Sequence, residues 1–196
     1  MREIKIGNKK IGQNNPCYTI AEAGANHEGE LKKAFKLIDA AAYSKADSIK
    51  FQTYTASKLV TKTAPKYWDD GIKGETQFDV FSKLDSLKKS DWEEIFNYAE
   101  KKGITCFSTP FDEDSVDLLY SLGVEAFKIA SADITHIPLI KKVASKKIPI
   151  FMSTGMASDE DIIDAVETIK NQGNHSIILM HCMTSYPTPI ENANLE

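Results

Sequence analysis

Short apolar segments recur along this chain, and longer stretches with a helical repeat separate them. Each of the six segments is too short for a stable helix and is bounded by turn-forming or polar residues, which predicts buried β-strands. They lie at Tyr18–Glu22, Ser48–Gln52, Ile104–Thr109, Glu125–Ala130, Ile148–Ser153 and Ile177–His181. Between them, apolar residues fall on one helical face, as they do from Leu31 to Ala41. This alternation predicts a parallel sheet whose strands are connected by helices.

The predicted helices carry recognisable end signals. In chain order these are Ser90 with Glu93, Asp112, Thr135 with Pro138, and Ser158 at helix starts, and Gly103 and Gly123 at helix ends. A hairpin is predicted at Glu3–Ile11. The connection Thr53–Lys88 is too long for a plain loop, which is typical of functional lids or of loops with helices of their own, such as Gln77–Leu84.

Two architectures fit this alternation, an open doubly wound sheet and a (β/α)₈ barrel. The first strand–helix turn contains Gly24 and Gly29 but no GxGxxG pattern, and the chain has no Walker A loop, which disfavours nucleotide binding. A complete barrel needs roughly 250 residues. The chain has 196 residues, so a barrel would lack its last strand–helix units.

Composition limits the partners. The net charge of −4 does not favour nucleic acid or an anionic membrane surface. No apolar run approaches the ~20 residues that a membrane helix needs. Three cysteines without a CxxC pair, Cys17, Cys106 and Cys182, are typical of reduced thiols, and we expect a cytoplasmic location. No cluster of residues in the sequence has the spacing of metal ligands.

Two lysines interrupt apolar strands, Lys50 between Ile49 and Phe51, and Lys128 within Phe127–Ile129. Because strand side chains alternate between faces, each lysine points into the barrel if its apolar neighbours pack under the helices. A buried ammonium needs a partner. One interpretation pairs the lysines with Glu22 and Asp133. The other is an anion site, where ammonium and hydroxyl groups bind a phosphate or carboxylate.

The remaining polar residues at the strand ends are less specific. Glu22 ends an apolar strand, where a carboxylate could hold sugar hydroxyls or act as a general base. His27 fits a helix start or a site residue equally well, and His181 fits a core position or a ligand. His136 and His175 are typical of surface or cap positions.

Six motifs in register resemble the N-acetylneuraminate (sialic acid) synthase family. They are IAEAGANHEG at Ile20–Gly29, KFQT at Lys50–Thr53, FSTPFD at Phe107–Asp112, FKIASAD at Phe127–Asp133, MSTGM at Met152–Met156 and HCMTSYPTP at His181–Pro189. The resemblance implies an α/β fold, a (β/α)₈ TIM barrel that is incomplete here, with about six strands and five long helices. We therefore predict one N-terminal synthase barrel domain over residues 1–196, without the last barrel units and without the family's C-terminal antifreeze-like domain.

The resemblance also implies a reaction. Members of the family condense phosphoenolpyruvate with an N-acetylated amino sugar, form a nine-carbon 2-keto sugar acid and release phosphate. By resemblance, phosphoenolpyruvate is held by Lys50, Thr109, Lys128, Ser131 and Ser153, with Thr184 at a position near the phosphate. The sugar is contacted by Glu22, Gln52, Phe111 and Tyr186. Asp133 stands where relatives often have a glutamate that assists proton transfer, and with Glu22 it is the predicted catalytic pair.

Cofactor and partner are implied in the same way. The family uses a divalent cation, Mn²⁺ or Mg²⁺, to polarise the aldehyde of the sugar. The two histidines that hold it belong to the last part of the barrel, and nothing in this chain matches them. The full-length protein is expected to be a homodimer, and this chain alone is expected to be inactive.

Three hypotheses follow. The first is a sialic, legionaminic or pseudaminic acid synthase, whose sugar the sequence does not specify. The second is a Schiff-base pyruvate aldolase that uses Lys128 as its nucleophile. The third is a fragment that binds sugar or phosphate without catalysis.

Overall fold

The computed structural model describes residues 3–68, 71–185 and 187–195, which form two compact units, residues 1–125 and 126–196. In the described part of the chain, no helix is long and apolar enough to cross a membrane. The prediction of a single domain over residues 1–196 is untested and stays a prediction. Each unit is considered by itself below.

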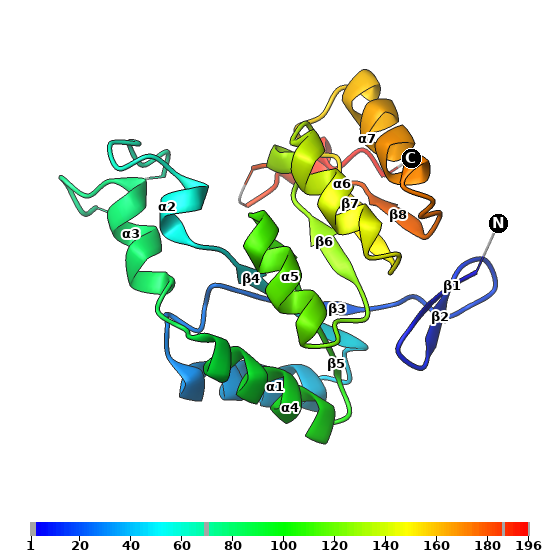
Figure 1. The fold of residues 1–196 in the computed structure, drawn as a ribbon, viewed down its shortest axis with the longest axis horizontal. Helices are drawn as coiled ribbons and strands as arrows, with labels where there is room; N and C mark the ends of the chain where they lie inside the picture. The colour runs from blue at the N-terminus through cyan, green and yellow to red at the C-terminus, as the bar shows by residue number, and fades with distance from the viewer. Residues whose placement is uncertain (1–2, 69–70, 186, 196) are drawn as a thin grey trace. The chain divides into compact units, whose positions relative to one another are not determined.

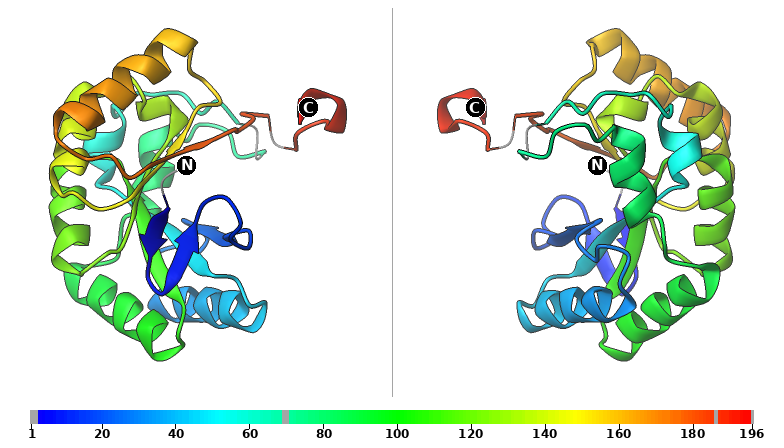
Figure 2. Two further views of the ribbon diagram at one scale, coloured as in Figure 1. Left: turned by 90° about the vertical axis from the view of Figure 1, so that its right-hand side faces the viewer. Right: turned by 90° about the vertical axis from the view of Figure 1, so that its left-hand side faces the viewer.

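The first unit contains a hairpin, three parallel strands and five helices (Figures 1 and 2). The hairpin predicted at Glu3–Ile11 is confirmed, since β1 (Ile4–Ile6) pairs antiparallel with β2 (Lys9–Ile11). The parallel strands pair in chain order: β3 (Ile20–Gly24), β4 (Ser48–Thr53) and β5 (Thr105–Pro110). The helices are α1 (Leu31–Tyr43), α2 (Ala56–Leu59), α3 (Gln77–Leu84), α4 (Lys89–Lys101) and α5 (Glu113–Ser121).

One face of this sheet is covered by α1 and α4, which lie side by side (Figure 1). Ile49 and Phe51 of β4 are fully buried in this core, against Ile38 of α1 and Trp92 and Ile95 of α4. Burying each such side chain stabilises the fold by about 1.5–3 kcal/mol. Because strand residues alternate in direction, Lys50 is turned to the opposite face, as the sequence predicts.

The second unit repeats the pattern with three shorter strands. They are β6 (Phe127–Ile129), β7 (Ile150–Ser153) and β8 (Ile177–Met180), again parallel and paired in chain order. Two long helices, α6 (Ile137–Ser145) and α7 (Asp159–Asn171), and two 3₁₀ turns, η1 (Ser131–Asp133) and η2 (Ile190–Asn192), complete it. Phe127 and Ile129 are buried on either side of Lys128, so this lysine has the same alternating context as Lys50.

The predicted helix ends are confirmed at four places and wrong at two. Asp112 and Ser158 cap α5 and α7 through their side chains, and Gly103 and Gly123 follow α4 and α5 with positive φ. Ser90 is not an N-cap, because α4 begins at Lys89 with Lys88 as its N-cap, and the Asp91 carboxylate accepts the backbone N–H of Lys88 at 2.8 Å. The N-cap of α6 is His136 rather than Thr135.

The connection Thr53–Lys88 carries α2 and α3, and its predicted helix Gln77–Leu84 is confirmed. Two carboxylates bind backbone N–H groups near the start of this connection. The buried Asp112 accepts the N–H of Thr55 at 3.2 Å while it caps α5, and Asp85 accepts the N–H of Ala56 at 2.8 Å. The start of α2 is therefore held from two directions.

Candidate active site

Lys50 is the centre of a polar cluster in the first unit. Its side chain is 10% exposed, and its Nζ lies 2.7 Å from Glu22 Oε2 and 2.9 Å from Glu22 Oε1. The same ammonium donates to Thr109 Oγ1 at 3.3 Å. Three predicted site residues from β3, β4 and β5 are thus brought together, because strand pairing sets Glu22 beside Lys50 and Gln52 beside Thr109.

A register shift at the end of β3 shapes the space beside Glu22. The pairing slips between Glu22 and Gly24, and Gly24 has a φ of +53°, which favours glycine. A Cβ at Gly24 would lie 3.2 Å from Glu22 Oε1 and 3.9 Å from Gln52 Cδ and Nε2. The side chains of Glu22 and Gln52 therefore approach the backbone of Gly24, and these two predicted sugar contacts lie together.

Phe111, the third predicted sugar contact described by the structure, follows β5 and belongs to an aromatic cluster. Its ring centroid is 6.0 Å from that of Tyr54, and Tyr54 is 5.7 Å from Phe81 of α3, both in edge-on geometry. Trp68 lies 5.9 Å from Phe81. Sequence reasoning missed Tyr54, although its position two residues after Gln52 places it on the same side of the chain as Lys50 and Gln52.

Lys128 and Asp133 are the charged residues predicted in the second unit. Lys128 is 8% exposed, and its Nζ donates to the Ile129 carbonyl at 2.8 Å. Asp133 lies in η1, and its Oδ2 is buried with no hydrogen-bond partner in the described residues. Burial raises the pKa of the Asp133 carboxyl, although the positive charges of His136 and Lys128 oppose this rise. The protonated form of Asp133 is therefore more favoured than that of an aspartate exposed to solvent.

Three predicted hydroxyls of the second unit differ in burial. Ser153, at the end of β7, is buried and lies 3.2 Å from Cys182 Sγ, which donates to it. Ser131 is half-buried in η1, and Thr184 is exposed in the irregular segment after β8. Tyr186, the fourth predicted sugar contact, lies outside the described residues.

The four histidines differ in burial and in hydrogen bonding. His27 is buried, and its Nδ1 accepts the N–H of Gly29 at 3.0 Å, so it belongs to the interior of the first unit. His136 caps α6, and His175 is exposed. His181 is also exposed, with Nε2 2.8 Å from the Ala193 carbonyl. Within residues 3–68, 71–185 and 187–195, no three His, Cys, Asp or Glu side chains are grouped to hold a metal.

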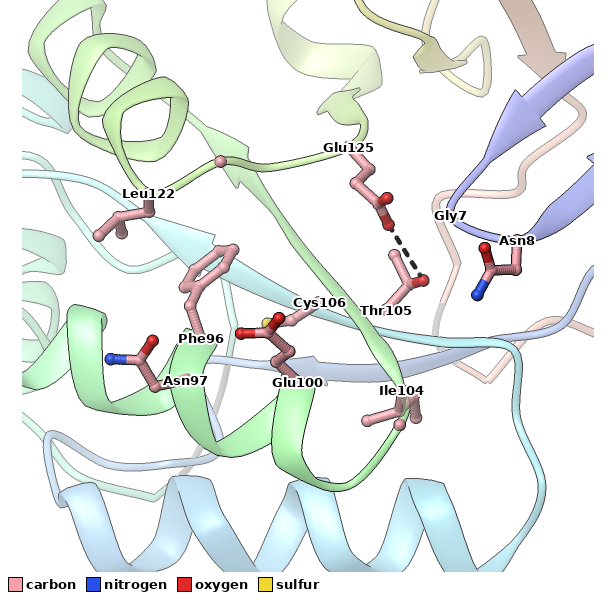
Figure 3. Close-up of a pocket in the computed structure, with 12 residues that line it drawn as sticks. Gly7, Asn8, Phe96, Asn97, Glu100, Ile104, Thr105, Cys106, Leu122 and Glu125 are labelled. Atoms are coloured by element: carbon pink, nitrogen blue, oxygen red, sulfur yellow. Dashed lines mark hydrogen bonds between the residues drawn. The ribbon is translucent and has the colours of Figure 1, made fainter.

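A cavity of about 470 Å³ lies at the amino end of β5 (Figure 3). Its lining includes Thr105, the first residue of β5, and Glu125, whose carboxylate accepts a hydrogen bond from Thr105 at 3.3 Å. Thr109, which accepts a hydrogen bond from Lys50, lies near the carboxyl end of the same strand. In α/β barrels the active site is at the carboxyl ends of the strands, so this cavity is not our candidate.

Parallel strands that alternate with helices and carry buried lysines, as β4 and β6 do, are typical of TIM-barrel domains. The chain belongs to the NeuB family, whose sequence model matches residues 37–196. The resemblance predicted from the six motifs is therefore confirmed.

Solved structures confirm the predicted fold class, a (β/α)₈ TIM barrel present in part. The N-acetylneuraminic acid (sialic acid) synthetase of Leptospira borgpetersenii serovar Hardjo-bovis, in complex with citrate, has 38% identity and a TM-score of 0.85, over 98% of this chain and 63% of that one. A truncated 3-deoxy-D-arabino-heptulosonate 7-phosphate synthase from Thermotoga maritima, at 17% identity and a TM-score of 0.65 over 91% of this chain and 55% of its own, shares the fold alone.

Curated relatives include a polysaccharide biosynthesis protein and a legionaminic acid synthase. The spore coat polysaccharide biosynthesis protein SpsE of Bacillus subtilis is 41% identical over 100% of this chain and 52% of its own length. The N,N'-diacetyllegionaminic acid synthase of Legionella pneumophila is 39% identical over 97% of this chain and 55% of its own. The chain thus spans about half the length of the curated relatives it matches.

Proposed function

We propose that the protein containing this chain condenses phosphoenolpyruvate with an N-acetylated amino sugar, to form a nine-carbon 2-keto sugar acid and release phosphate. The observation that carries the proposal is the Lys50 ammonium, buried at the carboxyl ends of the strands beside the Thr109 hydroxyl. Membership of the NeuB family and relatives named as legionaminic and pseudaminic acid synthases support the same reaction.

Lys50 and Thr109 suit the phosphate or carboxylate of phosphoenolpyruvate. An ammonium has three donors, and in this cluster it contacts both carboxylate oxygens of Glu22 and the Thr109 hydroxyl, so an anion would bind by taking the place of one of these partners or by sharing a donor with it. A charge-assisted bond to an anion is about twice as strong as a neutral one. Glu22 then has two roles. It orients Lys50, and together with Gln52 it accepts hydrogen bonds from the hydroxyls of the sugar.

The remaining proposed roles belong to residues of the second unit. Lys128, Ser131, Ser153 and Thr184 are proposed to contact phosphoenolpyruvate, and Asp133 to move a proton at its methylene carbon. The raised pKa of Asp133 supports this role, because a carboxyl that titrates nearer to neutrality is a better acid and base at working pH. Tyr186 remains a proposed sugar contact.

The divalent cation, Mn²⁺ or Mg²⁺, belongs to the proposal only for the full-length protein. The described residues offer no grouped set of ligands for it, so no step is assigned to a metal here. Homodimer formation and a cytoplasmic location are proposed on the same family grounds. A chain restricted to residues 1–196 is expected to be inactive.

The test is an assay of the full-length gene product. It is incubated with phosphoenolpyruvate and, in turn, N-acetylmannosamine and the diacetamido sugars that lead to legionaminic and pseudaminic acids, with and without Mn²⁺. We expect phosphate release and a product with the mass of the 2-keto acid for one of these sugars. Binding of phosphoenolpyruvate without turnover of any sugar would instead support a non-catalytic binding protein.

A second experiment separates condensation from Schiff-base chemistry. Borohydride is added during incubation of the full-length protein with pyruvate, and the protein is analysed by mass spectrometry. We expect Lys128 to stay unlabelled, because in the proposed condensation it binds phosphoenolpyruvate and forms no covalent bond to the substrate. A reduced pyruvate adduct on Lys128 would support the aldolase hypothesis.

A further inference from the structure

A cavity of about 10 Å³ lies beside the end of β4, inside the first unit. Its lining combines four polar or titratable side chains with three apolar ones: His27, Gln52, Tyr54 and Asp85, and Leu84, Leu87 and Trp92. This volume is that of about one water molecule, and a buried water needs two to four polar partners. The size and the lining of the cavity both meet these requirements.

Tyr54 brings a buried hydroxyl to this cavity. Its Oη has no hydrogen-bond partner in the part of the chain that the structure describes. Burial, assisted by the negative charge of Asp85, raises the pKa of Tyr54 to about 12, so the hydroxyl keeps its proton. A buried hydroxyl without a partner is unfavourable, because it has lost its hydrogen bonds to water without replacing them.

His27 and Asp85 complement this hydroxyl. His27 Nδ1 accepts the N–H of Gly29, and burial lowers the pKa of the imidazole, so the neutral ring carries its proton on Nε2 and can donate it. Asp85 Oδ2 accepts the N–H of Ala56, which leaves Oδ1 as an acceptor. The cavity therefore joins a donor, an acceptor and a hydroxyl that can act as either.

The ring of Tyr54 connects the cavity to the proposed sugar contacts. Its centroid lies 6.0 Å from that of Phe111 and 5.7 Å from that of Phe81, so the ring is packed between the end of β5 and helix α3. Gln52 lines the same cavity as Tyr54. Tyr54 thus neighbours both Phe111 and Gln52 without being one of the predicted contacts.

We propose that Tyr54 is a positioning residue for the sugar side of the site, which orients Phe111 through its ring and Gln52 through one water molecule bound in the cavity. The water accepts a hydrogen bond from His27 Nε2–H, donates to Asp85, and bonds Tyr54 Oη and the Gln52 carboxamide. This inference rests on the proposed function, because it takes Gln52 and Phe111 to contact the amino sugar.

Two measurements on the full-length protein test it. In a crystal structure that resolves ordered water, we expect one peak about 2.7–3.1 Å from both Tyr54 Oη and His27 Nε2. In steady-state kinetics, Tyr54→Phe keeps the ring and removes the hydroxyl, so the KM for the amino sugar should rise about 3- to 10-fold, as for the loss of one hydrogen bond. The KM for phosphoenolpyruvate should stay unchanged. Tyr54→Leu, which also removes the ring, should raise the KM for the sugar further.

Tyr98→Phe is the matched control, because it removes a tyrosine hydroxyl that donates to Asp39 in the same unit, away from the cavity. It should leave both KM values unchanged. The inference is overturned if the cavity shows no water in the density, or if Tyr54→Phe matches Tyr98→Phe in its KM for the sugar. If the full-length protein condenses no sugar, the proposed function is wrong, and the density alone decides whether the water is bound.

Discussion

Lys50 and Lys128 have the same position in the sequence pattern and different surroundings in the structure. Each interrupts an apolar strand, and each is nearly buried, with an exposure of 8%. Lys50 is ion-paired with both oxygens of Glu22, whose side chain remains 55% exposed. In the unit of Lys128, Asp133 holds a buried oxygen without a hydrogen-bond partner in the described residues.

This difference separates two uses of a carboxylate. Glu22 meets the Lys50 ammonium where its own side chain is in contact with solvent, so water screens this ion pair. Burial of Asp133 disfavours the ionised form, and its pKa rises despite the nearby positive charges. In the proposed reaction, the first carboxylate is suited to hold and orient, and the second to exchange a proton.

The largest expected effect is that of Asp133→Asn. If Asp133 moves a proton at the reacting carbon, kcat should fall about 10²- to 10⁴-fold while the KM for phosphoenolpyruvate changes little. Steady-state kinetics of the full-length protein with the accepted sugar measure this. A loss confined to KM would show that Asp133 binds substrate rather than transferring a proton.

A smaller effect on activity is expected from Lys50→Met. Loss of a hydrogen bond from a charged group to the anion is worth about 1.5–3 kcal/mol, which corresponds to a decrease of roughly 10- to 150-fold in kcat/KM for phosphoenolpyruvate. Lys102→Met is the matched control, since Lys102 pairs with Asp39 at the surface of the same unit at 2.5 Å. Equal activities of the two variants would remove Lys50 from the anion site.

The pH dependence of stability should distinguish Asp133 from an ordinary capping carboxylate. Because its pKa is raised in the folded state, the folded protein binds more protons than the unfolded chain between the ordinary value of 3.8 and the raised value. The contribution of Asp133 is therefore present at low pH and is lost as the pH rises through that window. Relative to wild type, Asp133→Asn should become more stable with rising pH, as measured by urea unfolding.

Asp161→Asn provides a control of opposite sign. Hydrogen bonds from the backbone and side chain of Ser158 lower the pKa of Asp161, so its contribution is present above the ordinary value and lost as the pH falls. This variant should become less stable than wild type with rising pH. Parallel pH profiles for the two variants would contradict the assignment of a desolvated Asp133.

The smallest effect is expected when Glu22→Gln and wild type are compared in their stability to unfolding. Glu22 is more than half exposed, so the ion pair with Lys50 is screened by water, and its loss should lower the free energy of unfolding by at most about 1 kcal/mol. Chemical denaturation of wild type and variant measures this. A loss of several kcal/mol would indicate that the pair is mainly structural.

Much of the fold was predictable because strand and helix periods differ. All six predicted strands are present, with ends that are unchanged or shifted by at most two residues, and Gln77–Leu84 is present as predicted. Cap positions were less predictable, since several polar residues near Lys88 and Thr135 compete to satisfy the same N–H groups. At α4 the N-cap is Lys88 rather than Ser90, and Asp91 takes the place predicted for Glu93 by accepting the N–H of Lys88.

The candidate site was predictable as far as single strands determine it. The inward direction of Lys50 follows from its apolar neighbours, and its bonds to Glu22 and Thr109 follow from parallel pairing. The roles of Tyr54 and Asp85 were not predictable, because they depend on how the long connection folds back beside β4. No periodic pattern in the sequence encodes that return.

The close approach at Gly24 has an evolutionary consequence. A Cβ there would be in tight contact with Glu22 Oε1, at 3.2 Å, and in ordinary contact with Gln52, at 3.9 Å, and the residue would also have to adopt a positive φ. Position 24 is therefore constrained both by its backbone conformation and by the end of the Glu22 side chain. A lineage that replaces Gly24 should also accommodate a displaced Glu22 carboxylate, which is the partner of Lys50, so substitutions at positions 22 and 24 are expected to be coupled.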